Sequence, residues 1–244
     1  MNEGIVIDLY NFGSSHKVID IISKNGRIEK FFLYRPSLIS NMQKTHDCLD
    51  FLTLIKYEKK SGDKISSIEI EYDFREIKVD FKKLIICSIA SELVKHFDEI
   101  QQTKKEESFI FSFFYDFLIN IERYKDIKPN QYYSFLFWFL LNVLIFSGTF
   151  NYQSNCDLCS ELISGVNAYY NLNTGQYVCE RHLKQKNANY PFIKIPDHFA
   201  GISRFEEIND NFSKDLFSFL VRIYKYNFSI NNLKTLKFLK YLTN

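Results

Sequence analysis

The chain has 244 residues and a formal net charge of +2, and 46% of its residues are hydrophobic against 25% charged. This balance excludes a largely disordered chain, and 8 Gly with 4 Pro exclude a collagen-like or linker-rich protein. The small net charge excludes a histone-like polycation but is compatible with a local basic patch. No secretion signal follows Met1, so we expect a reducing, cytoplasmic location where cysteines serve as metal ligands or free thiols.

The first eighty residues follow the rhythm of β-strands. Short β-branched or aromatic runs alternate with turn residues, and Asn25-Gly26 between two of these runs predicts a hairpin. Five strands in so short a stretch predict a small, curved OB-fold β-barrel, which we place at residues 1–78. The predicted strands are Gly4–Tyr10, Lys17–Ser23, Arg27–Tyr34, Asp50–Tyr57 and Ile65–Tyr72.

From residue 79 the pattern becomes helical, because hydrophobic residues recur every four positions from Phe81 to Phe97. The predicted fold class is therefore α+β, with an α-helical domain at residues 79–244. The further predicted helices are Ser108–Ile121, Gln131–Phe146, Ser213–Tyr226 and Asn232–Leu242.

One uncharged stretch, Tyr133–Phe150, has nearly the length of a membrane span. Polar residues such as Asn142 interrupt it, and no Lys/Arg cluster lies tightly against either end. We therefore favour a helix buried within the helical domain over a membrane-spanning helix.

The most specific motif joins Cys156-Asp-Leu-Cys159 to Cys179-Glu-Arg-His182. Each pair has the two-residue spacing of a zinc knuckle, and the sequence between the pairs predicts a hairpin that brings them together. Three cysteines and one histidine fill all four positions of tetrahedral zinc, so we expect one structural Zn²⁺ per chain in an insertion at about residues 153–185. The alternative is that these four residues are unrelated.

Catalytic motifs are absent from the sequence: no phosphate-binding loop, dinucleotide fingerprint, nucleophile elbow or H-E-x-x-H motif is present. We therefore expect a protein that is not an enzyme. A zinc hydrolase is the rival enzymatic interpretation, and it would need an open ligand position on the metal.

Basic residues gather within the predicted barrel. Residues 13–64 hold 10 Lys/Arg against 6 Asp/Glu, a net charge of +4, which favours contact with phosphate backbones. Ordinary solvated lysines are the alternative interpretation. Phe31, Phe32 and Tyr34 offer stacking surfaces for bases, but at least half of such a run should face the core, so we assign none of them as sites. The predicted DNA-binding residues are Lys24, Arg27, Arg35 and Lys44.

The order of these parts resembles the RecO family of bacterial recombination mediators. The resemblance rests on the opening strands Gly4–Asp8 and Tyr10–Ser23, on Phe81–Phe97 at the entry to the helical domain, and on Leu140–Cys159 leading into the first knuckle. His182 stands where the family commonly has a cysteine, and zinc accepts either ligand.

The resemblance implies an N-terminal OB fold, a helical domain and a zinc-binding insertion. It also implies DNA repair and recombination without covalent chemistry: binding of single- and double-stranded DNA, annealing of complementary strands, and recombinase loading with RecR near the bacterial nucleoid. A further implied partner is the acidic tail of single-stranded DNA-binding protein. Positive charge beside apolar residues predicts that Arg222, Lys225 and Lys237 contact this tail. An RNA-binding or adaptor protein with a barrel and a zinc knuckle is the alternative function.

Overall fold

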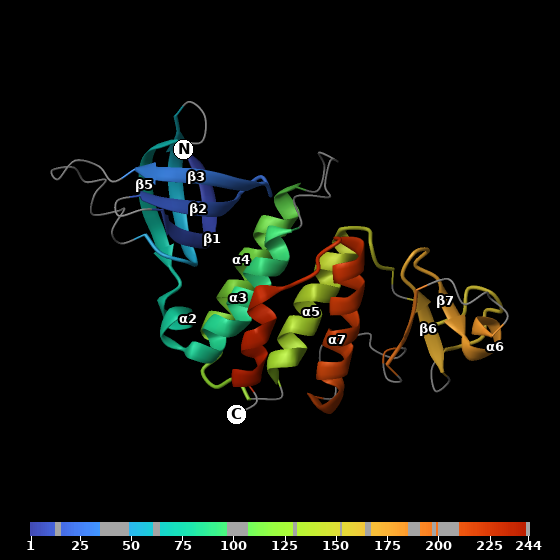
Figure 1. Cartoon of the computed structure of the whole chain (residues 1–244). Helices are drawn as coiled ribbons and strands as arrows, with labels where there is room; N and C mark the ends of the chain where they lie inside the picture. Colours follow the sequence, from blue (N-terminus) through green and yellow to red (C-terminus); the bar gives the residue numbers. More distant parts are fainter. Residues whose placement is uncertain are drawn as a thin grey trace. The chain divides into compact units, whose positions relative to one another are not determined.

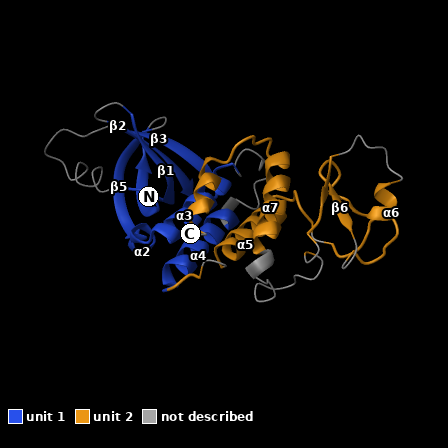
Figure 2. Ribbon diagram, turned by 60° about the horizontal axis from the view of Figure 1, so that its bottom comes forward, with its two compact units in different colours: residues 1–125 blue, residues 126–244 orange. Residues whose placement is uncertain are grey.

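The computed structural model describes residues 1–12, 16–34, 49–60, 64–96, 107–128, 131–151, 153–163, 167–184, 191–196, 199 and 210–242 (Figure 1). The chain divides into two compact units, Met1–Lys125 and Asp126–Asn244 (Figure 2). The first unit groups the strands with the helices that follow them, so it extends beyond the domain boundary predicted at residue 78.

Five strands of the first unit form one sheet in the order β3-β2-β1-β4-β5, and every neighbouring pair is antiparallel (Figure 1). The predicted strands and the mixed α+β class are thus confirmed. The strands are β1 (Asn2–Phe12), β2 (His16–Ser23), β3 (Ile28–Tyr34), β4 (Thr53–Lys59) and β5 (Ile65–Asp73). The predicted hairpin at Asn25-Gly26 joins β2 to β3, and Gly26 has the positive φ of 84° that such a turn requires.

The two edge strands of this sheet approach each other at one point. Phe32 of β3 and Lys64, just before β5, form an isolated parallel bridge. No continuous ladder joins β3 to β5 within the described residues, so the sheet is open there. A closed OB-fold barrel is therefore not confirmed.

Strand β2 is buried on both of its faces. Ile19 and Ile21 point into a core shared with Phe31, while Asp20 and Ile22 occupy the opposite face and are also buried. Successive side chains of a strand point to opposite faces. A second layer must therefore cover the outer face of the sheet.

Helices α2 (Arg75–Val79), α3 (Phe81–Lys95) and α4 (Glu107–Arg123) follow the sheet. Asp80 caps α3, because its carboxylate accepts hydrogen bonds from the backbone N–H groups of the second and third helical residues. The predicted hydrophobic stripe is buried in its middle part, whereas Phe81 at its start is 58% exposed. Its last member, Phe97, lies outside the described residues. The short helix α2 was not predicted.

The end of α3 is fixed to the sheet by an ion-pair cluster. Lys95 Nζ lies 2.5 Å from Asp20 Oδ2 and 2.7 Å from Asp8 Oδ2, so one amine joins β2 to β1. Burial lowers the pKa of Lys95, but the hydrogen bonds and charges of the two carboxylates outweigh burial and raise it. The amine therefore stays charged and compensates the buried carboxylate of Asp20, which is 1% exposed.

In the second unit, α5 (Gln131–Phe146) and α7 (Asp210–Asn227) pack side by side (Figure 1). Nearly the whole circumference of α5 is buried, which confirms the prediction of a buried helix. None of the described helices combines the length and the apolar character that crossing a bilayer requires. The helix predicted at Asn232–Leu242 is instead the 3₁₀-helix η3 (Lys234–Tyr241).

A small module lies between these helices in the chain. Its three-stranded sheet has the order β7-β6-β8, with β6 (Ala168–Asn171), β7 (Tyr177–Cys179) and β8 (Phe192–Lys194). The one-turn helix α6 (Glu180–Leu183) follows β7 directly. We call residues 153–196 the insertion module, which extends beyond the predicted limit near 185 because β8 pairs with β6.

The ion-pair cluster yields a first prediction. Lys95→Met should lower the free energy of opening of β2, as measured by amide exchange, by about 3 kcal/mol. The substitution leaves the Asp20 charge buried without its main partner. The combined change Lys95→Met with Asp20→Asn should lose less. Hydrogen–deuterium exchange of peptides covering β2 and α3 measures this protection. Lys30→Met is the matched control, since its exposed amine lies 3.6 Å from Asp20. Equal losses for Lys95→Met and Lys30→Met would contradict the assigned role.

Candidate metal centre

The first cysteine pair lies in a tight knuckle at the start of the insertion module. The backbone N–H of Cys156 donates to Glu161 O at 2.8 Å, and the N–H of Ser160 donates to Cys156 O at 2.8 Å. Ser160 takes a positive φ of 58°, which closes the loop. These bonds turn the side chains of Cys156 and Cys159 to the same side.

The second pair is presented by a strand and the helix that follows it. Cys179 ends β7 and occupies the N-cap position of α6, and His182 lies within that helix. Asp157 ties the first knuckle to the same strand: its N–H donates to Tyr177 O at 2.9 Å, and its carboxylate accepts from the N–H of Tyr177 at 2.6 Å. The β6–β7 hairpin and Asp157 therefore bring the two pairs together.

The four predicted ligands converge on one point. Their ligand atoms all lie within 4.8 Å of one another. Cys179 Sγ is 3.2 Å from His182 Nδ1 and 4.0 Å from Cys159 Sγ, and Cys156 Sγ is 3.8 Å from His182 Nδ1. Ligands at about 2.0–2.3 Å from a tetrahedral ion are separated from one another by about 3.5–3.8 Å. The donor set is thus compact enough to hold a single metal ion.

The local environment favours the ionised form of the first sulfur ligand. Burial raises the pKa of Cys156, but hydrogen bonds from backbone N–H groups, that of Cys179 first among them, outweigh burial and lower its pKa. The N–H of Cys179 donates to Cys156 Sγ at 3.4 Å. Because the thiolate is the form that binds metals, these bonds prepare a ligand.

Cys87 is not a member of this cluster. Cys87 is fully buried in α3, and burial raises the pKa of its thiol well above the ordinary value. It acts as a small hydrophobic residue. Cys48 lies outside the described residues.

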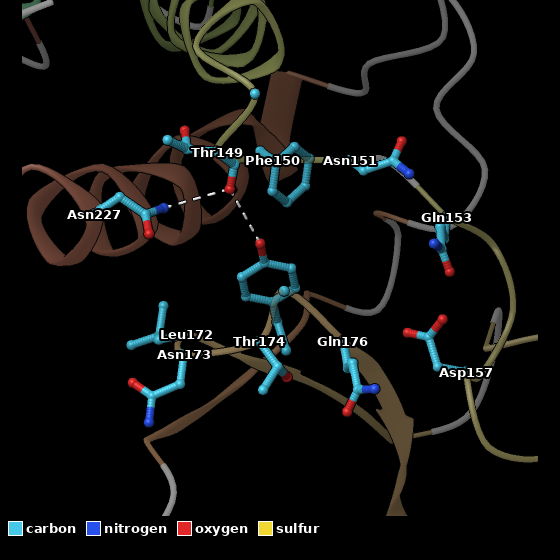
Figure 3. A pocket seen from close by; sticks show the side chains of 13 residues that line it. Thr149, Phe150, Asn151, Gln153, Asp157, Leu172, Asn173, Thr174, Gln176 and Asn227 are labelled. Carbon is cyan, nitrogen blue, oxygen red and sulfur yellow. Dashed lines mark hydrogen bonds between the residues drawn. The ribbon is translucent and has the colours of Figure 1, made fainter. Parts of the chain in front are cut away.

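A hollow of about 380 Å³ lies beside the insertion module, between the turn after α5 and the β6–β7 turn (Figure 3). The Tyr170 hydroxyl and the Asn227 amide each donate a 3.5 Å hydrogen bond to Thr149 O. Among the described residues that line it, Asp157 alone carries a charge, and the polar remainder are amides and hydroxyls. The hollow can bind a neutral polar group but offers no cation to an acidic partner.

Two of the predicted DNA-binding residues share one turn. Lys24 and Arg27 are both exposed in the loop between β2 and β3, and Lys24 Nζ lies 2.9 Å from the Glu3 carboxylate. An exposed ion pair of this kind is weak, so a phosphate can replace Glu3. Arg35 and Lys44 lie outside the described residues.

The structure adds an aromatic residue that the sequence interpretation did not single out. Phe12 is 59% exposed, and its ring lies 6.5 Å edge-on from the ring of Phe32, which is 38% exposed. Phe31 is buried in the core, as expected for half of that run. The two-residue period of β1 places Phe12 on the same face as Tyr10, so strand alternation was the signal that could have identified it.

The structure exposes two of the three cations predicted to contact an acidic tail but buries the apolar residues beside those on α7. Arg222 is exposed on α7, and Lys225, one turn later, donates to Asn231 O at 3.4 Å. Lys237 is exposed on η3. The apolar residues expected beside the two α7 cations are fully or almost fully buried, so they do not form an open pocket; these are Leu216, Leu220 and Ile223.

No protein-family profile matches the chain, and no curated protein matches it significantly.

The cluster geometry predicts that Cys156→Ser loses the bound metal and destabilises the second unit but not the first. Elemental analysis should find about one metal ion per chain in the unmodified protein and less in the variant. Exchange of amide hydrogens should accelerate in peptides from β6, β7 and α6 while β1–β5 stay protected. Cys87→Ala, which removes a cysteine that is not part of the cluster, should keep the metal. Unchanged metal content and unchanged exchange in Cys156→Ser would refute the ligand assignment.

Proposed function

We propose that the chain is a non-enzymatic, zinc-containing nucleic-acid-binding protein of the RecO type, which anneals DNA strands and acts as a recombination mediator. The observation that carries this proposal is the order of parts. A five-stranded sheet precedes a set of helices, and a Cys₃His cluster is inserted between α5 and α7. The same order underlies the resemblance of the sequence to the RecO family.

Zinc is the metal that suits this cluster best. Thiolate and imidazole ligands together favour zinc over the hard cations Mg²⁺ and Ca²⁺, and the two-residue spacing in each pair is typical of structural zinc sites. Four protein ligands leave no position for water on a tetrahedral ion. The proposed role is therefore structural: the ion holds the two knuckles of the insertion module together.

The strand order supports an OB-type barrel for the first unit. In the observed order, β3 and β5 are the edges, and barrel closure requires these two strands to pair. The parallel bridge between Phe32 and Lys64 is one contact of that pairing. OB folds bind oligonucleotides on the face of their second and third strands, so we propose β2 and β3 as the binding surface.

Edge strand β3 provides a track for a nucleic-acid strand. Arg27 precedes it, and the side chains of Lys30 and Phe32, two residues apart, share one face of the strand. The Lys30 side chain is 53% exposed, and Phe32 forms the aromatic pair with Phe12. Cations for phosphates beside exposed rings for bases are the combination that single-strand binding uses.

Contact with the acidic tail of single-stranded DNA-binding protein, through Arg222, Lys225 and Lys237, stays a prediction. RecR is proposed as a partner on the family resemblance alone. The RNA-binding or adaptor alternative requires equal affinity for RNA and DNA and no annealing, so one set of assays separates the two functions.

The proposed DNA surface is tested by Lys24→Ala with Arg27→Ala. This variant should bind all duplex sequences more weakly, and the slope of log affinity against log salt should become shallower by about 1.8, because two phosphate contacts are lost. Fluorescence anisotropy measures binding, and an annealing assay with complementary oligonucleotides measures function. Lys125→Ala with Lys128→Ala makes the same charge change outside the sheet and should leave both unchanged.

Failure of the unmodified protein to bind or anneal DNA would overturn the proposed function. Normal binding by the Lys24/Arg27 variant at low salt would instead place the DNA surface elsewhere. Equal binding of RNA and DNA without annealing would favour the adaptor function.

A further inference from the structure

The end of the chain carries a three-residue repeat. From Leu233 the sequence reads Leu-Lys-Thr, Leu-Lys-Phe and Leu-Lys-Tyr, and Leu242 follows. Its 3₁₀-helix, η3, is eight residues long, whereas 3₁₀-helices longer than about three or four residues are uncommon. Because a 3₁₀-helix has 3.0 residues per turn, positions three apart lie directly above one another. In an α-helix the same positions would wind around the axis by about 60° per triplet.

The match between repeat and helix produces three straight rows of side chains. The leucine row faces the protein: Leu233 and Leu242 at its ends are buried, and Leu236 and Leu239 are half-buried. The lysine row is exposed along its whole length. It consists of Lys234, Lys237 and Lys240.

The lysine row has a regular spacing along the helix axis. A rise of about 2.0 Å per residue separates neighbouring lysines by about 6 Å and the outer two by about 12 Å. One strand of a duplex presents a phosphate every ~3.4 Å, so the row faces about three or four phosphates. The sequence contains no Asp or Glu after Asp215, so no acidic residue of this segment opposes the row.

The third row adds aromatic rings beside the lysines. Lys237 Nζ lies 5.0 Å from the ring centroid of Phe238, and Lys240 Nζ lies 4.9 Å from that of Tyr241. The two rings are 6.4 Å apart at an interplanar angle of 30°, and Tyr241 is 45% exposed. Aromatic faces beside a line of cations suit unpaired bases attached to a phosphate backbone.

We infer that η3 is a binding site for single-stranded nucleic acid, in which the lysine row contacts backbone phosphates and the rings of Phe238 and Tyr241 stack on bases. This site rests on the proposed nucleic-acid function and adds a contact in the second unit to the track proposed on β3. An acidic peptide also complements the charge of the row, but it does not account for the aromatic row. This inference assigns Lys237 to the nucleic-acid site, so the tail contact predicted above would rest on Arg222 and Lys225.

The test compares salt dependence among variants of the full-length protein. Lys234→Gln with Lys237→Gln and Lys240→Gln should make the salt slope for a fluorescent oligothymidylate shallower by about 2, at ~0.7 per phosphate contact. The ratio of the unmodified protein's affinity to that of the variant should therefore fall about twentyfold between about 50 and 200 mM salt. Lys125→Gln with Lys128→Gln and Lys184→Gln is the matched control of equal charge and should keep the unmodified slope.

Two further variants test the register and the rings. Lys237→Phe with Phe238→Lys keeps composition and charge but moves one amine off the row, so the slope should change by about 0.7. Tyr241→Ala should weaken binding without changing the slope. Circular dichroism melting confirms that each variant stays folded.

Three outcomes would overturn the site. If the triple lysine variant binds oligothymidylate as the unmodified protein does, the proposed function stands but η3 is not a contact. If that variant loses only the binding of a polyglutamate peptide, the row is a protein-binding surface. If the unmodified protein binds no oligonucleotide, both the site and the proposed function fail.

Discussion

In the proposed account, charge compensation within the Cys₃His cluster is the constraint on which the insertion module depends. Cys159 Sγ and Cys179 Sγ lie 4.0 Å apart, and two thiolates at that distance repel each other by about 4 kcal/mol at an effective dielectric constant near 20. A divalent cation held by the four ligands would turn this repulsion into attraction. The strands of the module have three or four residues each, which is too short for stability without such a tie.

A chain of packed aromatic rings connects the cluster to the helices of the second unit. Tyr177 leads into Cys179 and lies 5.2 Å, centroid to centroid, from Tyr170. Tyr170 in turn lies 5.5 Å from Phe150, after α5, and 6.2 Å from Phe219 of α7. These contacts make the module part of the second unit, so loss of the metal should loosen the packing between the module and α7. In the first unit, the ion pairs of Lys95 join α3 to the sheet.

Much of the fold could be predicted because its signals are local. The strands follow from β-branched runs around turns such as Asn25-Gly26, and the helix at Gln131–Phe146 is found at its predicted bounds. The four residues of the candidate metal site could be identified because their spacing in the sequence is typical of zinc ligands.

The burial of individual side chains could not be predicted, because the spacing of residues in the sequence does not show which faces tertiary packing covers. Leu216 and Leu220 have the pattern of an apolar patch beside cations, but packing of α7 against α5 buries them. Exposure of Phe12 and burial of Phe31 depend on which face of the sheet is covered. The three-residue repeat of η3 matches the period of the 3₁₀-helix that the structure shows. The same leucines also match the pattern of an amphipathic α-helix, so the repeat alone did not decide between the two.

The most direct test of the metal centre is X-ray absorption spectroscopy at the zinc edge, on protein purified without added metal. The proposed zinc centre predicts a bound zinc ion with three sulfur ligands at about 2.3 Å and one nitrogen ligand at about 2.0 Å. A protein without zinc, or a first shell dominated by oxygen, would contradict the proposed structural zinc centre.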